Sequence, residues 1–244
     1  MSEVLPLPTR KSEEWRYSDL DALAQLWPLP TAEAIAVLAG GKFSRAVVLD
    51  AGGVVRLQLS LGAGAVAAVH ALNAGAGYGR IELDVTLAEG ADFTLGAAQV
   101  GGGSANLEIV ATVTHAGPDA TSRQIVRSVL GGSATGTCLG KVAVARGANG
   151  TDAEQSVRAM LLDRTAQANA KPELEIFADD VKCAHGCAVG ELDAAALFYL
   201  QSRGLPPAEA KVLMLQAFLA EAFVGADDEE RLLALALEHL AELV

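Results

Sequence analysis

The chain has 244 residues, of which 51% are hydrophobic and only 5% aromatic, and it carries a net charge of −12. This length allows one substantial core with a smaller appendage. The acidic balance argues against nucleic acid and against an anionic membrane surface as partners, because both attract clustered Lys and Arg. Three cysteines in a chain of this length do not make a disulfide framework, so we expect a reduced, cytoplasmic protein.

Residues 1–42 are expected to form an N-terminal helical segment. Ser12 is a plausible N-cap, and acidic residues follow it where the helix dipole favours them, which predicts a helix over residues 12–26. Pro28 and Pro30 then end this helix, and residues 31–41 (TAEAIAVLAGG) are expected to add a further helical turn or two.

Residues 43–190 have the texture of short β-strands in a repeat. Apolar runs rich in Val, Ile and Leu alternate with breaks rich in Gly, Asn and Asp that recur every dozen residues or so. Several runs alternate with period two; in GRIELDVTL, Ile81, Leu83 and Val85 face one way while Arg80 and Glu82 face the other.

Two architectures fit this repeat, an antiparallel sandwich and a solenoid. Short Asn-Gly hairpin loops and core aromatic residues are scarce, which counts against the sandwich. Small interior residues at regular coil lengths suit a parallel β-helix, in which each coil contacts only its neighbours. Since the strict six-residue period of left-handed β-helices is absent, the right-handed parallel β-helix is favoured.

Residues 191–244 read as a C-terminal helical domain. Asp193 opens one helix that Gly204 closes, Pro206 and Pro207 open a second, and Asp227–Asp228 precede a third. The middle helix is apolar on more than one face and includes a stripe with Leu215, Leu219 and Phe223, with Phe218 beside it. Such a helix either packs in the protein's own core or is covered by a partner.

The sequence VKCAHGCAV gathers Cys183, His185 and Cys187 at positions i, i+2 and i+4. If this segment is a strand, all three side chains project from one face, and thiolates with an imidazole suit zinc, iron or an iron–sulfur cluster. The competing interpretation makes the cysteines small core residues. His185 fits that interpretation less well, because a buried imidazole needs a hydrogen-bond partner.

Paired acids such as Asp179–Asp180 raise the alternative of a β-helical carbohydrate-active enzyme, because glycoside hydrolysis uses two carboxylates. Adjacent residues of a strand point to opposite faces, so a solvated loop is the favoured interpretation of this pair. A stand-alone metal-binding solenoid that uses Cys183, His185 and Cys187 is a further alternative.

Residues 140–204 resemble the SufD branch of the SufB/SufD family of the SUF iron–sulfur cluster assembly system. The specific parts are KPELEIFADDVKCAHG and LFYLQSRG, and KSEEWRYSDLDAL near the N-terminus is a shorter match. The resemblance implies a right-handed parallel β-helix with a C-terminal helical domain and no catalytic activity of its own. The chain departs from the family in being shorter than many relatives.

The same resemblance implies partners and site residues. The chain would pair with a homologous SufB-like subunit and bind the SufC-like ABC ATPase through its helices, with a homodimer as the alternative when it is isolated. Cys183 and His185 would lie near the subunit interface where a transient iron–sulfur cluster forms, with His185 the stronger metal ligand, and the isolated chain would hold no cluster tightly. Cys187 departs from the family pattern and is given no role. The surface around Leu215, Phe218 and Phe223 would be part of the ATPase docking surface.

Overall fold

The computed structural model describes residues 6–12 and 15–244, and this part of the chain contains four helices and twelve strands. The strands are β1 (Glu33–Val37), β2 (Lys42–Leu49), β3 (Gly53–Leu61), β4 (Val66–Gly75), β5 (Tyr78–Leu87), β6 (Asp92–Gly101), β7 (Asn106–His115), β8 (Thr121–Leu130), β9 (Thr135–Val144), β10 (Asp152–Leu161), β11 (Gln167–Ile176) and β12 (Lys182–Gly190). The helices are α1 (Leu20–Gln25), α2 (Ala194–Ser202), α3 (Pro207–Ala220) and α4 (Glu229–Ala241).

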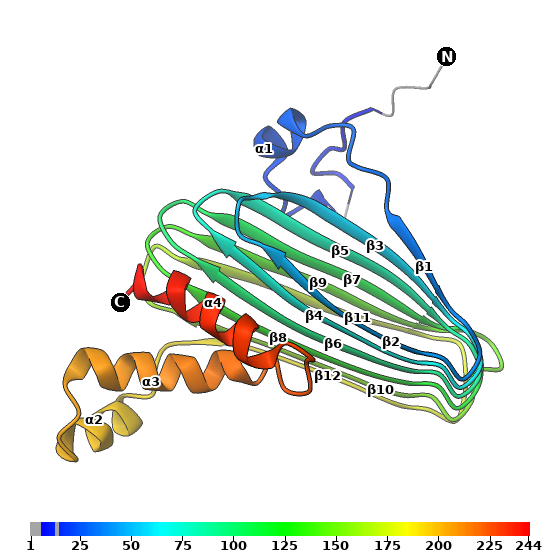
Figure 1. Ribbon diagram of the computed structural model, residues 1–244. Helices are drawn as coiled ribbons and strands as arrows, with labels where there is room; N and C mark the ends of the chain where they lie inside the picture. Colours follow the sequence, from blue (N-terminus) through cyan, green and yellow to red (C-terminus); the bar gives the residue numbers. More distant parts are fainter. Residues whose placement is uncertain (1–5, 13–14) are drawn as a thin grey trace.

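Successive strands alternate between two parallel sheets. Sheet A has the order β1-β3-β5-β7-β9-β11, and sheet B has the order β12-β10-β8-β6-β4-β2. Each coil therefore adds one strand to each sheet, and every strand pairs in register with the strand two positions away in the chain (Figure 1). This arrangement confirms the parallel β-helix and rules out the antiparallel sandwich.

The period-two alternation sets which side chains face the interior. In β5, Ile81, Leu83 and Val85 are buried between the sheets, and Glu82 lies on the outer face of sheet A. The interior is lined mainly by Val, Leu, Ile and Ala. Tight corners join the strands, and Gly90 adopts a positive φ of 62° at one of them, a conformation that glycine adopts without steric cost.

Two N-terminal expectations change. Within the described part of residues 12–26, the only helix is the short α1, whose N-cap is Asp19 rather than Ser12; Glu13 and Glu14 lie outside the described residues. The helix expected over residues 31–41 is wrong, because residues 33–37 form β1 and pair with β3. Pairing with an existing sheet satisfies the backbone and buries Val37, which outweighs the helical propensity of the alanines.

The C-terminal helices form where the sequence predicted them. Asp193 caps α2 through hydrogen bonds to the backbone of Ala195 and Ala196, and Pro207 is the first residue of α3. Helices α3 and α4 lie along the outer face of sheet B, against β4, β6 and β8, while α2 packs on α3 away from the strands (Figure 1). No helix in the described ranges has the length and apolar character needed to span a bilayer.

Each end of the solenoid has two edge strands, one from each sheet. β1 and β2 are the outermost strands at one end, and β11 and β12 are outermost at the other. No described strand pairs with the outer edges of β11 and β12, so their outward backbone N–H and C=O groups are unpaired within the sheets. Apolar side chains are also exposed at this open end: Ile176, Phe177 and Val189.

Candidate functional site: the open end of the solenoid

The candidate site lies on β12, the last strand of sheet B. Cys183, His185 and Cys187 pair in register with Ala153, Gln155 and Val157 of β10, whose side chains point into the solenoid. The strand is confirmed, and the three side chains share its inward face as the spacing predicted. Because β12 is an edge strand, this face is at the open end: Cys183 is half-buried, and His185 and Cys187 are exposed.

The three thiols of the protein have different surroundings. Cys183 packs against an interior cluster that includes Val142 and Val144, and burial raises the pKa of its thiol. Cys138 of β9 is fully enclosed, and burial, with a smaller contribution from the nearby Cys187, raises its pKa to about 12. Both are therefore protonated at neutral pH, and a metal that binds Cys183 must displace a proton.

The exposed face can supply part of a metal site. Within residues 6–12 and 15–244, no cluster of three or more His, Cys, Asp or Glu side chains is arranged to hold a metal ion. Cys183 and His185 nevertheless offer one sulfur and one nitrogen ligand from neighbouring inward positions. A tetrahedral iron or zinc bound by these two would keep two positions for ligands from elsewhere.

Sequence reasoning missed two polar side chains that lie below His185. Gln155 and Gln124 occupy consecutive inward positions on β10 and β8, and they are 2% and 4% exposed. Nε2 of Gln155 donates to Oε1 of Gln124 over 3.3 Å. The signal was present in the sequence, because DAEQSVRA places Gln155 in an otherwise apolar inward row with Ala153 and Val157.

The three side chains predicted to dock an ATPase are in the protein's own core. Leu215 and Phe223 are fully buried and Phe218 is 7% exposed, and all three pack with the outer face of sheet B. The expected docking surface around them is therefore not accessible, and the core interpretation is the correct one for these residues. The aromatic side chains that the helices do expose are Phe198 and Tyr199 of α2, at 72% and 57%.

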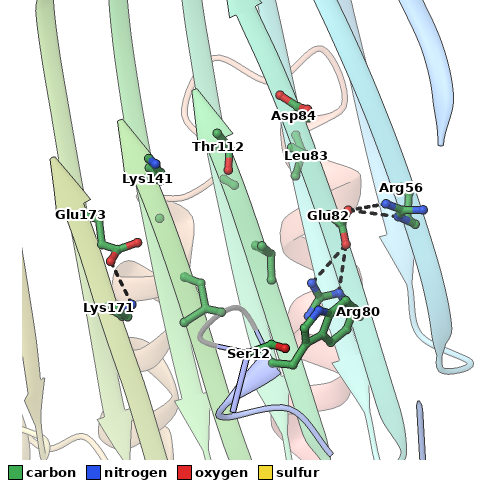
Figure 2. A pocket seen from close by; sticks show the side chains of 15 residues that line it. Ser12, Arg56, Arg80, Glu82, Leu83, Asp84, Thr112, Lys141, Lys171 and Glu173 are labelled. Carbon is green, nitrogen blue, oxygen red and sulfur yellow. Dashed lines mark hydrogen bonds and ion pairs between the residues drawn. The ribbon is translucent and has the colours of Figure 1, made fainter. Parts of the chain in front are cut away.

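A groove of about 670 Å³ lies on the outer face of sheet A. Val110 and Leu139 line it together with the side chains labelled in Figure 2. Its four cations are each paired with a carboxylate of the chain: Arg56 with Glu82, Arg80 with Glu82 and Glu108, Lys141 with Glu175, and Lys171 with Glu173.

The N-terminal segment contributes to the lining of this groove and contacts a buried ion pair of the solenoid. Arg80 binds the fully buried Glu108 at 2.5 Å, and the ring of Trp15 lies over the guanidinium at 4.1 Å. Ser18 donates to the same carboxylate over 3.0 Å. The Trp15–Ser18 part of the N-terminal motif therefore anchors the chain to the solenoid, which gives that motif a structural role.

The paired acids at residues 179–180 are solvated, and the histidines at positions 70 and 115 are buried. Asp179 and Asp180 lie in an exposed bend between β11 and β12, as the solvated-loop interpretation held. His115 is fully buried, with Nε2 at 2.9 Å from Ser122 Oγ, and burial lowers its pKa to about 4. His70 is buried where the helices meet sheet B, and burial lowers its pKa as well. Neither histidine is accessible to a substrate.

These features define a parallel β-solenoid with a thiol–imidazole face at an uncovered end. The family model described as "SUF system FeS cluster assembly, SufBD core domain" matches residues 50–218, more than half of the chain. The chain therefore belongs to the SufBD core-domain family, as the sequence resemblance predicted.

Among known relatives, the chain is 37% identical over 108 residues to the iron–sulfur cluster assembly protein SufD of Escherichia coli, covering 44% of this chain and 26% of the relative. It is 35% identical over 108 residues to SufD of Bacillus subtilis, covering 44% and 25%. A SufBD family protein of Synechocystis is 38% identical over 111 residues, covering 46% and 24%. The matched region thus amounts to about a quarter of each relative's length.

Proposed function

We propose that the chain is a non-catalytic scaffold subunit for iron–sulfur cluster assembly, located in the cytoplasm. The observation that carries this proposal is the position of Cys183 and His185 on the uncovered inward face of an edge strand, in a member of the SufBD family. Ligands on such a face become enclosed only when a second molecule covers the end of the solenoid.

The partner at the open end is a second, SufB-like β-solenoid. β11 and β12 present unpaired backbone groups, and Ile176, Phe177 and Val189 expose apolar area beside them. Another solenoid with equivalent edge strands satisfies both, because strand pairing supplies the hydrogen bonds and the apolar side chains leave water. When the SufB-like subunit is absent, a second copy of this chain forms a homodimer through the same edges.

The SufC-like ABC ATPase binds the helical domain at α2. This helix is rich in apolar residues, and none of its side chains is buried. Phe198 and Tyr199 expose aromatic area that α3 leaves uncovered, and aromatic side chains are enriched at the energetic centres of protein interfaces. The docking surface proposed here replaces the buried one around Leu215.

The cluster is cargo that forms between the two solenoids and then leaves. Cys183 and His185 supply a sulfur and a nitrogen ligand, and the second subunit supplies the rest. A half site of this kind binds weakly by itself, so the isolated chain holds no cluster tightly. Cys183 loses its proton when iron binds, because the thiolate is the ligand.

Anaerobic affinity purification from the native cell, with partner identification and iron and sulfide assays, tests this function. We expect an ABC ATPase, a second β-solenoid subunit and labile iron. The variant His185→Ala should retain both proteins but lose iron and sulfide, whereas His239→Ala, on helix α4, should retain all of them. Recovery of the wild-type chain alone, without iron, would refute the scaffold role.

A further inference from the structure

We propose that Gln155 is a positioning residue that orients the His185 imidazole by accepting a hydrogen bond from one of its ring N–H groups. The inference rests on the proposed role of His185 in the scaffold function. It concerns a side chain two strands earlier in the chain, inside the solenoid, where no ligand can reach it directly.

The argument begins with an interior ladder formed by Gln124, Gln155 and His185. These residues occupy the same inward position on the neighbouring strands β8, β10 and β12. Adjacent parallel strands lie about 4.8 Å apart, so polar side chains at paired positions are within hydrogen-bonding reach of each other. The first step of the ladder is made, because Gln155 Nε2 donates to Gln124 Oε1 at 3.3 Å.

The second step of the ladder has an acceptor that is not used. Gln155 is 2% exposed, and its Oε1 is buried without a hydrogen-bond partner among the described residues. Leaving a buried amide oxygen unsatisfied is unfavourable, because it loses its hydrogen bonds to water and gains none in return. The amide can extend into the interior because residue 140 on β9 is glycine; a Cβ there would lie 2.9 Å from Gln155 Nε2.

His185 is the next member of the ladder and the one that can donate. His185 is the residue of β12 that pairs with Gln155. Its neighbours along that strand, Ala184 and Gly186, have no polar side-chain atoms. A hydrogen bond from one ring N–H to Oε1 satisfies the buried oxygen and fixes the tautomer. The other ring nitrogen then keeps its lone pair for a metal, the arrangement that ligating histidines commonly show.

The test measures the His185 tautomer by ¹⁵N NMR in the full chain, labelled at histidine and assigned with His185→Ala. We expect one predominant tautomer in the wild type. Gln155→Leu should shift both ring-nitrogen signals towards the averaged values of a freely exchanging imidazole. Gln155→Glu keeps an acceptor oxygen and should retain the single tautomer, and Gln124→Leu, one strand further away, should also retain it.

An averaged His185 signal in the wild type overturns the proposal, even if Gln155→Leu fails to fold. Ring-nitrogen signals that are unchanged in a folded Gln155→Leu variant overturn it too. The readout requires neither cluster nor partner, so it separates this inference from the scaffold function. Iron recovery together with an averaged wild-type tautomer would refute only the role of Gln155.

Discussion

A charge at an exposed apolar residue of the helical domain should weaken ATPase binding, whereas a charge at a buried one should lower stability. Phe198→Asp alters a side chain that is 72% exposed on α2, so the free energy of unfolding should change by less than ~0.5 kcal/mol. Loss of an aromatic residue at the centre of an interface costs about 2 kcal/mol of binding, which is roughly a 30-fold increase in the Kd for the ABC ATPase.

Leu215→Asp is the buried counterpart of this variant. Leu215 is fully buried between α3 and sheet B, and removing a buried leucine side chain costs ~2–5 kcal/mol even before a carboxylate is placed there. That is a large part of the ~5–15 kcal/mol that stabilises a typical domain. We therefore expect a lower melting temperature or a detached helical domain, rather than a selective loss of binding.

Thermal melts and calorimetric titration with the purified ATPase measure both effects. Leu38→Asp is the matched control, because Leu38 is 80% exposed in the turn between β1 and β2, at the other end of the solenoid. It should leave both stability and binding unchanged. The reasoning is refuted if a folded Phe198→Asp variant binds the ATPase normally, or if Leu215→Asp melts like the wild type.

Three further predictions concern the open end, the buried ion pair and acid stability. Val189→Lys should weaken pairing with the second solenoid at least about 100-fold in a titration, because an uncompensated buried charge costs ~3–5 kcal/mol; normal pairing would contradict the proposed interface. Glu108→Leu should lower urea stability by about 1–3 kcal/mol because it removes the buried carboxylate that Nη1 of Arg80 contacts, while Glu82 still pairs with the guanidinium; Glu82→Gln, at a partly exposed carboxylate, should cost less. Burial lowers the pKa of His115 to about 4 from 6.5, so its contribution to stability is complete above pH 6.5 and is lost as the pH falls towards 4. Between pH 6.5 and pH 4 the unfolded state binds more protons than the folded state, so up to about 3 kcal/mol of the free energy of unfolding is lost. His115→Gln should flatten the dependence of stability on pH in this range, and an unchanged dependence would exclude His115 as the cause.

The strand pattern made the solenoid predictable, but the first strand of the solenoid could not be predicted from its own sequence. In GRIELDVTL the alternation of Ile81, Leu83 and Val85 with charged residues reports directly which face is buried. Residues 31–41 contain four alanines and no such charge alternation, so local propensity favoured a helix. Only the edge of β3, formed by residues more than twenty positions later, makes the extended form favourable there.

The candidate site was predictable in identity but not in its surroundings. The spacing of Cys183, His185 and Cys187 predicted a shared face, and β12 confirms it. The sequence does not show that this face belongs to an uncovered edge strand, because exposure depends on whether a further coil follows. The inward position of Gln155 was readable from the alternation in DAEQSVRA, but its partners were not, because its neighbours across the strands lie about thirty residues away on either side.

The sequence by itself determined the repeat, the inward and outward faces of its strands, and the order of helices after Asp193. These follow from local stereochemistry, because side chains alternate along a strand and caps act within a few residues. The tertiary structure decided which apolar side chains are core. Leu215 and Phe223 are buried and Phe198 is exposed, although all three are apolar residues of the same helical region. Helical periodicity shows only that a helix has an apolar face to bury, and the position of sheet B determines which face is buried.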